Sequence, residues 1–388
     1  MLKNLHIWLP HYICRSLAGV PKTVQQDTIH IIFCFVDHFE PMWNHPSYKE
    51  EVRRVERWCK VYPQLCSVHR DSDGKPPQHT FFYPAEEYRA EHLDRLAELC
   101  RKGYGEVEIH LHHDRDTAEV LREKLIRFKR RLATHGLLSV ALDNHSSDNA
   151  EDLRYGFIHG NWALDNSRRD GRWCGVSGEL AVLRETGCYA DFTFPSAPSE
   201  TQPRKTNSVY YAKSRPGRSK SYNSGVDVEV AGRERGDLMI IEGPLALNWK
   251  SRKFGLLPRI ETGDFRSSSP TIKERVDLWV SQHIHVRRRP QWVFVKIHAH
   301  GAQERDMQAL LGSQADEMFS YLEEKYNTGR YRLHYATARE MYNIVKAAEA
   351  GCEGDPGMYR DYLLVPAWRA KEEEGRRQTA KGKSAMSL

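Results

Sequence analysis

The sequence predicts an α/β fold in which a parallel sheet is closed, or partly closed, into a barrel. Short apolar runs typical of buried strands alternate with longer amphipathic segments typical of helices. This alternation favours parallel strands joined by right-handed crossovers. Three of the apolar runs also end in imidazole or carboxylate side chains, at 33–38, 107–114 and 294–301. Strands that end in such residues are typical of a barrel with one polar site at its rim.

Eight segments have the β-branched and aromatic character of buried strands and are bounded by turn-forming residues. They are 29–36, 80–83, 107–111, 155–160, 189–194, 238–242, 292–297 and 331–336. Helices are expected at 86–100, 116–135, 178–186 and 338–350. In the first of these, Leu93, Leu96 and Leu99 are spaced for one buried face. The second is acidic at its start and basic at its end, which complements the helix dipole.

The chain of 388 residues is long enough for one large domain or two smaller ones. Residues 28–350 contain all the predicted strands and are expected to form the barrel, after a lead-in at 1–27. The segment at about 195–236 is rich in Pro, Ser, Gly and Arg and is expected to be an insertion at the strand ends. Residues 351–388 form a C-terminal extension, which is charged from about 369 and is expected to be disordered there.

The positive charge of the chain is local. The net charge is +6, but residues 204–220 carry six basic residues and no acid, and residues 369–388 carry six basic residues against three acids. The remainder of the chain is therefore slightly acidic, unlike a general nucleic-acid-binding surface. We expect no nucleic-acid partner.

The sequence predicts a protein of the cytoplasm. No apolar run approaches the length of a transmembrane helix, and the first ten residues lack the apolar core and cleavage site of a signal peptide. The eight cysteines are scattered without C-x-x-C spacing, which fits free thiols in a reducing compartment better than a disulfide framework.

Three strand-end segments resemble the motifs of the metal-dependent polysaccharide deacetylases, the chitooligosaccharide deacetylase homology domain. They are Phe35-Val36-Asp37-His38, Glu108-Ile109-His110-Leu111-His112 and Ile297-His298, in the order in which the family has them. The resemblance covers most of residues 28–340, and is greater to deacetylase-like proteins of surface-polysaccharide biosynthesis than to secreted chitin or peptidoglycan deacetylases. It implies a distorted (β/α) barrel of seven or eight strands that uses a divalent metal to remove acetyl groups from sugars.

The resemblance also implies a role for individual residues. In the family, the first strand ends in two Asp residues, of which one activates water and the next binds the metal. Here they correspond to Asp37, the expected general base, and His38, an expected ligand. The second motif places the other two ligands at His112 and Asp116. The resulting set of two His and one carboxylate leaves a coordination position open for water.

Two further imidazoles are alternative ligands. On an extended strand His110 lies on the same face as His112, whereas His113 points away unless the strand has ended. Zinc is the expected ion for a His-rich set, and nickel, cobalt or iron is compatible with the same residues.

The third motif corresponds to the family's late apolar strand, which ends in a catalytic His. That His protonates the leaving group and stabilises the oxyanion. The spacing from Ile297 favours His298 for this role, and His300, on the same face of an extended chain, is the alternative.

The fourth strand departs from the family pattern. The family has at this place an Arg that pairs with the base Asp, and no such Arg is present at 157–165. His159, Asn161 or Asp165 is a candidate substitute. Asn161 and Trp162 are also candidates for a sugar platform, because aromatic faces stack on pyranose rings.

Four residues outside the motifs are candidates for substrate binding. Glu86 follows the second strand and also fits a helix start. Arg339 follows the last strand, where Thr337 fits a helix cap. Arg204 and Lys205 begin the basic segment and are expected to meet an anionic part of the substrate, such as a nucleotide or a lipid-linked pyrophosphate.

Together these features predict a metal-dependent hydrolase that removes an acyl group, most simply N-acetyl, from a sugar or an activated sugar precursor in polysaccharide biosynthesis. The expected substrates are acylated sugars, free or linked to a nucleotide or lipid. A metal-dependent phosphoesterase or a glycoside hydrolase on a similar barrel is one alternative, although the latter needs paired carboxylates. A non-catalytic sugar-binding component of a polysaccharide assembly complex is the other.

Overall fold

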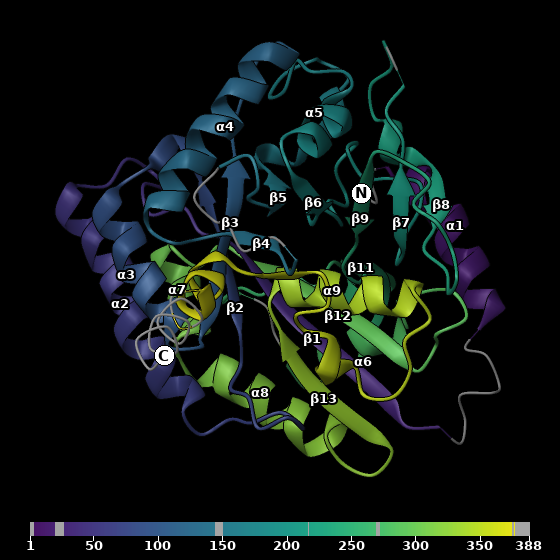
Figure 1. Ribbon diagram of the computed structural model, residues 1–388. Helices are drawn as coiled ribbons and strands as arrows, with labels where there is room; N and C mark the ends of the chain where they lie inside the picture. The colour runs from purple at the N-terminus through teal and green to yellow at the C-terminus, as the bar shows by residue number, and fades with distance from the viewer. Residues whose placement is uncertain are drawn as a thin grey trace, which may run out of the picture.

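A ten-stranded sheet forms the centre of the computed structural model, which describes residues 4–19, 27–143, 150–215, 217–268, 272–374 and 376 (Figure 1). The hydrogen-bonded order is β12-β1-β2-β3-β5-β6-β9-β7-β8, and β13 also pairs with β1. Neighbours are parallel except that β7 is antiparallel to β9 and β8. The strands are β1 (Ile29–His38), β2 (His79–Pro84), β3 (Gly105–Leu111), β5 (Tyr155–His159), β6 (Cys188–Asp191), β7 (Val209–Ala212), β8 (Gly225–Asp227), β9 (Leu238–Ile241), β12 (Trp292–Ala299) and β13 (Tyr331–Ala336).

The fold is mixed α/β with a mostly parallel sheet, as predicted. The sheet is not closed into a barrel. Its two edges are β12 and β8. The segment between α6 and β12 lies between these edges, where it makes one backbone hydrogen bond to β12, at Ile284, and an isolated bridge of two bonds through Arg287 to the residues that follow β8, rather than a ladder. This segment does not continue as a strand because His283 and Arg288 adopt left-handed backbone conformations, with φ of 50° and 67°.

Helices cover the sheet, and two small antiparallel pairs lie outside it. The pairs are β10 (Ala246–Lys253) with β11 (Leu257–Glu261), and β4 (Ser139–Ala141) with β14 (Leu364–Pro366). The helices are α1 (Leu5–Ala18), α2 (Tyr48–Cys66), α3 (Ala90–Arg101), α4 (Ala118–Thr134), α5 (Glu179–Glu185), α6 (Ile272–Ser281), α7 (Glu304–Leu310), α8 (Ser313–Tyr326) and α9 (Ala338–Glu349). Within the described ranges, none of these helices is both long and apolar enough to cross a membrane.

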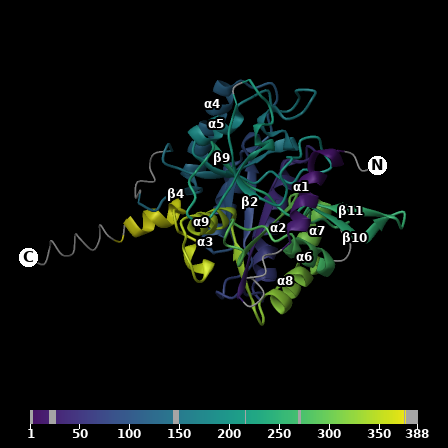
Figure 2. The ribbon, with the colours of Figure 1, turned by 90° about the vertical axis from the view of Figure 1, so that its right-hand side faces the viewer.

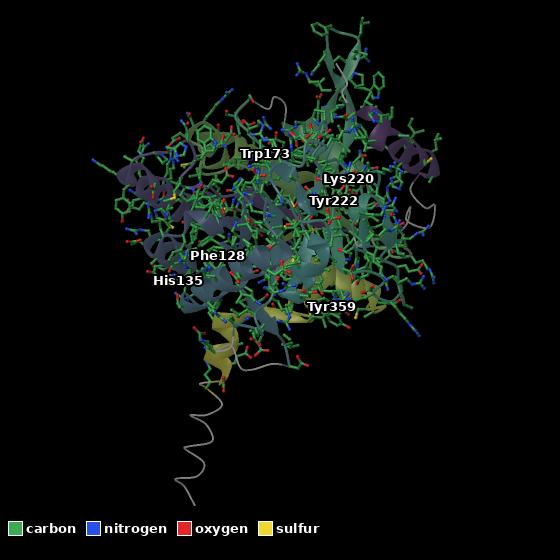
Figure 3. The ribbon with its side chains drawn as sticks, turned by 90° about the horizontal axis from the view of Figure 1, so that it is seen from above. Phe128, His135, Trp173, Lys220, Tyr222 and Tyr359 are labelled. Carbon is green, nitrogen blue, oxygen red and sulfur yellow. The ribbon has the colours of Figure 1, made fainter. Side chains whose placement is uncertain are left out.

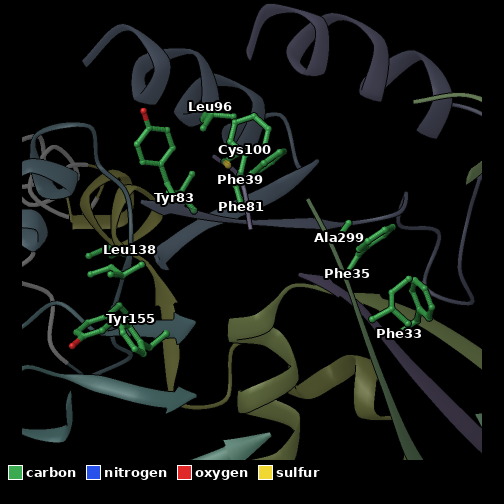
Figure 4. Packing of buried hydrophobic residues seen from close by; sticks show 14 of the residues in the cluster. Phe33, Phe35, Phe39, Phe81, Tyr83, Leu96, Cys100, Leu138, Tyr155 and Ala299 are labelled. Carbon is green, nitrogen blue, oxygen red and sulfur yellow. The ribbon is translucent and has the colours of Figure 1, made fainter. Parts of the chain in front are cut away.

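The alternating side chains of β1 enter two different cores, which is the period-two rule of a strand buried on both faces. Phe33 and Phe35 belong to the core that also includes residues of α2 and α3, and Figure 4 shows them beside Ala299 of β12. Cys34 and Val36 belong to the other core, which includes α9. By the same alternation, Asp37 is directed to the first core and His38 to the second face.

The register of β1 brings the strand ends to one level. β12 pairs with β1 from His30 to Asp37, β13 pairs with its first part, and β2 pairs with its last three residues. Asp37 is opposite Ala299 in this register, so that the next residues of the two strands, His38 and His300, emerge side by side.

The segments outside the expected barrel are partly built into the fold. Residues 195–236, expected to be an insertion, contribute β7 and β8 to the sheet. Trp8 of α1 is fully buried, so α1 packs against the body, and the β10–β11 hairpin projects beside it (Figure 2). Residues 367–374 are helical, contrary to the disorder expected from about 369, and residues 377–388 lie outside the described residues.

All eight predicted strands are confirmed, with bounds that differ by at most a few residues. The four predicted helices correspond to α3, α4, α5 and α9. Thr337 caps α9 and forms a capping box with Glu340, as the sequence pattern indicates. The pattern did not reveal α2, which has Glu and Arg at many positions and an internal Pro63.

His30 and His334 form a partly buried imidazole pair at the start of β1, with Nδ1 and Nε2 2.8 Å apart. Burial, and then the neighbouring His334, lower the pKa of His30 from 6.5 to about 4. Between these two pH values the unfolded chain takes up a proton that the folded protein does not, so the free energy of unfolding decreases as the pH falls. Replacing His30→Asn should therefore reduce the loss of stability between about pH 7 and about pH 4.5, measured by urea unfolding. The change His6→Asn, at an exposed histidine of α1, should leave that loss as in the wild type; equal losses in all three proteins would contradict the prediction.

Candidate functional site

His38, Glu40 and His110 bring their side chains together at the carboxyl ends of β1 and β3. One potential ligand atom from each lies within 4.8 Å of the others, and all three side chains are buried. His38 comes from the end of β1 and Glu40 from the turn that follows it, while His110 is the penultimate residue of β3. The carboxyl ends of two parallel strands of the sheet thus bring two imidazoles and one carboxylate to one point. We call this group the rim cluster.

The hydrogen bonds of His110 show how its ring is oriented. Its Nδ1 lies 2.9 Å from the carbonyl oxygen of Ile158, so Nδ1 carries the proton and donates it. Its Nε2 lies 3.3 Å from Oε1 of Glu40. Because Nδ1 is the donor to Ile158, Nε2 is held beside the Glu40 carboxylate either by a proton of its own or by a cation between the two atoms. A backbone acceptor on the far nitrogen is also the usual support of a metal-binding histidine.

His112 lies between two carboxylates beside the rim cluster. Its Nε2 is 3.2 Å from Oε1 of Glu40, and its Nδ1 is 2.5 Å from Oε1 of Glu86. Burial disfavours the charged ring, but the hydrogen bonds to Glu40 and Glu86 outweigh it and raise the pKa of His112 to about 10. Burial also acts on Glu40, where the two imidazoles reverse its effect and lower the carboxyl pKa. The side chain of His112 is 32% exposed, so this ring is accessible from solvent.

His300 and Trp162 form the other wall of the site. The ring of His300 is stacked on that of His38, with centroids 4.7 Å apart, and Trp162 lies 5.9 Å from His38 and 6.2 Å from His300. The turn that carries Trp162 approaches His112 closely, because a Cβ at Gly160 would lie 2.3 Å from the His112 ring. Only glycine fits there, and it allows Trp162 to reach the rim cluster.

Asp37 has a different place from the one expected of a general base. It is fully buried on the opposite side of β1 from His38, where its Oδ2 is 2.9 Å from Nε2 of His79. Its Oδ1 accepts the backbone N–H of Gly301 at 2.6 Å, and a Cβ on Gly301 would collide with this carboxylate. Trp58 closes the contact by donating its indole N–H to the Gly301 carbonyl. Asp37 therefore fixes the turn that follows His300 rather than facing the rim cluster.

His298 lies deeper than His300. Its ring centroid is 6.4 Å from that of His38, and its backbone bridges to Asp264. Burial lowers the pKa of His298 to about 3, and the nearby Asp264 only partly opposes this. The structure thus places His300 at the accessible rim and His298 behind it.

Asp116, expected as the third ligand, is not in the rim cluster. Both of its carboxylate oxygens accept hydrogen bonds from Nζ of Lys124, at 2.8 and 2.7 Å, and Oδ2 is 3.3 Å from Nδ1 of His113. His113 and His159 belong to a separate buried group with Cys174 and Glu179. His113 leaves the face of His110 and His112 because β3 ends at Leu111.

Two of the residues expected to bind substrate, Arg339 and Lys205, have other partners. Arg339 is buried and pairs with Glu106 at 2.6 Å, so it joins α9 to the start of β3 instead of reaching the site. Lys205 pairs with Asp227 at 2.7 Å. Arg204 is exposed and lines a hollow with other basic residues of the 195–236 segment. Figure 3 labels Lys220 and Tyr222 of this segment.

Glu86 and Trp162 lie at the rim cluster, as described above, and Asn161 precedes Trp162 in the same turn with a left-handed φ of 57°. Glu40, Cys174 and Glu179 were missed by the sequence reasoning. Glu40 could have been found, because it follows His38 by two residues at the end of the same strand. Cys174 and Glu179 follow no strand, so no pattern in the sequence connects them with His113 and His159.

A larger hollow, of about 710 Å³, lies at the opposite end of the sheet. Its lining includes Tyr189 and Met239, at the amino ends of β6 and β9. Active sites of parallel sheets lie at the carboxyl ends of the strands. The rim cluster is therefore the better candidate for chemistry.

Comparisons with known proteins leave the family open. No family model matches the sequence, and a search of curated proteins found no match. Among solved structures, the chain is similar to 4-alpha-glucanotransferase from Thermococcus litoralis, with 11% sequence identity and a TM-score of 0.41. The alignment covers 82% of this chain and 40% of that protein.

The change Asp37→Ala separates a positioning role from a base. It leaves the imidazole of His79 and the N–H of Gly301 buried without their partner, and should lower the free energy of unfolding by about 3 kcal/mol or more. Asp94→Ala is a matched control, since Asp94 also accepts from a histidine, His135, at 2.7 Å but is 69% exposed. It should cost less than about 1 kcal/mol in the same urea titration. An Asp37→Ala protein as stable as the wild type would contradict the positioning role.

Proposed function

We propose that the chain is a metal-dependent hydrolase that removes an acyl group, most simply N-acetyl, from a sugar or an activated sugar precursor. The observation that carries the proposal is the rim cluster, in which Nε2 of His110 lies 3.3 Å from the Glu40 carboxylate beside His38, while Nδ1 of the same ring is held by the Ile158 carbonyl. Buried imidazoles and a carboxylate that converge in this way, with an accessible side, have the composition of a catalytic metal site. The strand-end motifs that resemble polysaccharide deacetylases supply the reaction class.

His38, Glu40 and His110 are the proposed ligands of one divalent ion, zinc first, with nickel, cobalt or iron compatible with the same donors. This set replaces His38, His112 and Asp116, because Asp116 is engaged by Lys124. When bound, such an ion polarises a carbonyl and lowers the pKa of water. The chain itself supplies the orientation of the ligands, through the Ile158 carbonyl behind His110 and through the stack of His300 on His38.

Two accessible imidazoles are the proposed proton-transfer groups. His112 Nε2 gives a proton to the leaving amine or alcohol, since its position between Glu40 and Glu86 favours the protonated ring. His300 receives the proton of the attacking water, from its place beside His38. Asp37 acts through His300, because it holds the backbone of the next residue, Gly301.

Trp162 is the proposed platform for the sugar. It is partly exposed and lies beside both His38 and His300, so a pyranose stacked on its face would present a substituent to the rim cluster. A nucleotide or lipid-linked sugar remains the proposed form of the substrate. Arg204, Arg215, Arg218 and Lys220 line one hollow of about 240 Å³, which supports an anionic carrier. The cytoplasm remains the proposed location, in keeping with eight free cysteines.

The change Glu40→Gln tests the metal and the reaction together. It keeps the size of the side chain but removes the charge, and should abolish binding of about one ion per chain at the rim cluster. Elemental analysis of the purified protein, beside acetate release from a panel of acylated sugars, should show both losses together. His6→Ala, at an exposed histidine, should change neither. Metal binding without hydrolysis of any acyl sugar, together with hydrolysis of phosphate esters, would favour the phosphoesterase alternative.

The changes His300→Ala and His112→Ala should lower kcat for deacylation by about 100-fold or more while the rim metal is retained, because each removes a proton-transfer group and not a ligand. Glu86→Gln should lower kcat less and leave the metal in place, since it only orients His112. Loss of the metal from the His112→Ala protein would make His112 a ligand, as the sequence motif implies, and would contradict the role proposed for it.

A further inference from the structure

We propose that His113, His159, Cys174 and Glu179 form a second metal site, closed to solvent, that binds one zinc-type ion with a structural role. The proposal is independent of the proposed activity. All four side chains are buried, and one potential ligand atom from each lies within 4.8 Å of every other. Two imidazoles, a thiol and a carboxylate are a four-ligand set typical of zinc, and a site without an accessible side is typical of a structural ion.

The distances among the donors fit a common centre. Oε1 of Glu179 is 3.1 Å from Nε2 of His113 and 3.7 Å from Nε2 of His159. The second carboxylate oxygen, Oε2, accepts a hydrogen bond from the Cys174 thiol at 3.3 Å, and this thiol proton would leave when an ion binds. Donors that each lie about 2.0 to 2.3 Å from one ion in a tetrahedron are separated by spacings of this size.

The protonation pattern leaves a lone pair without a partner. His159 Nδ1 donates to the carbonyl oxygen of Gly160, so Nε2 is the unprotonated nitrogen. This Nε2 is fully buried and has no hydrogen-bond partner among the described residues, although it faces the Glu179 carboxylate. A lone pair opposed to a carboxylate in a dry interior is costly, and a cation between them removes that cost.

A carboxylate also lies near the far nitrogen of His113. Its Nε2 is directed at Glu179, while its Nδ1 is 3.3 Å from Oδ2 of Asp116, which Lys124 holds in place, and makes no hydrogen bond within the described residues. With Nε2 bound to a cation, the proton of this ring would lie on Nδ1, next to that carboxylate. Asp116, which the sequence motif marked as a ligand, thus has a role beside this second site.

The loop that carries Cys174 is held closely against the segment that follows β3. The N–H of Asp116 donates to the Cys174 carbonyl at 3.0 Å, and a Cβ at Gly175 would lie 2.8 Å from the backbone of Arg115 and Asp116. The backbone N–H groups of Asn166 and Val176 both donate to the sulfur, at 3.3 and 3.4 Å, which would offset part of the cost of a buried thiolate on a bound ion. The site would therefore join the ends of β3 and β5, this loop and the first residue of α5.

Cobalt provides a test that is specific for the thiolate. Wild-type protein is stripped with a chelator under reducing conditions and loaded with Co²⁺. A cobalt–thiolate charge-transfer band in the near ultraviolet is expected, because this site contains a cysteine and the rim cluster does not. The band should persist in Glu40→Gln, which separates this result from the fate of the proposed activity. Wild-type protein that binds no cobalt, or binds it without the band, would overturn the proposal.

Variants locate the band. Cys174→Ser should abolish it, whereas Cys188→Ser, at another buried cysteine, should retain it. Should Cys174→Ser fail to fold, His159→Gln tests the same site, since it keeps the thiol and removes one nitrogen. It should weaken the affinity for Co²⁺ by about tenfold or more, measured by titrating the charge-transfer band. A band that survives Cys174→Ser, or cobalt affinity unchanged in His159→Gln, would show that these residues are not the ligands.

Discussion

The pairing of β1 with β12, β13 and β2 is the constraint on which the rest of the structure depends. A strand buried on both faces has no freedom to slip by one residue, because a slip would exchange its two cores. Phe33 and Phe35 must enter the core shared with α2 and α3, and Cys34 and Val36 must enter the core that includes α9. With that register fixed, His38 and His300 emerge together and Asp37 turns away from them. The position of each polar residue at the rim follows from apolar packing several residues earlier.

The extent to which the sequence predicts the molecule depends on the range of the interactions. Strands such as 292–297 and 107–111 are visible because their periodicity is local, and so is the cap at Thr337. The open sheet was not predictable, because closure depends on how the segment near His283 folds between two distant edges. At the site, His38, His110, His112 and His300 stand out as strand-end residues. The positions that Asp37 and Asp116 take in the structure differ from those the motif implies. They were not predictable from spacing alone, since their partners, His79 and Lys124, come from other elements.

Burial separates the two His-rich groups in their chemistry. The rim cluster has partly exposed neighbours, His112 and Glu86, and can exchange protons and molecules with solvent. The group around Glu179 has no exposed member. A closed set of ligands stabilises a fold, whereas an open one leaves room for a reacting molecule. Similar sets of residue types are thus suited to different roles because their exposure to solvent differs.

The end of β3 at Leu111 has a consequence for how this region can change. His112 and His113 are adjacent, yet one faces Glu86 at the rim and the other faces Glu179 in the interior. Insertion or deletion of a single residue between His110 and His113 would exchange the two rings and disturb both centres at once. The length of this segment is therefore constrained, because each of the two adjacent histidines must reach a different carboxylate.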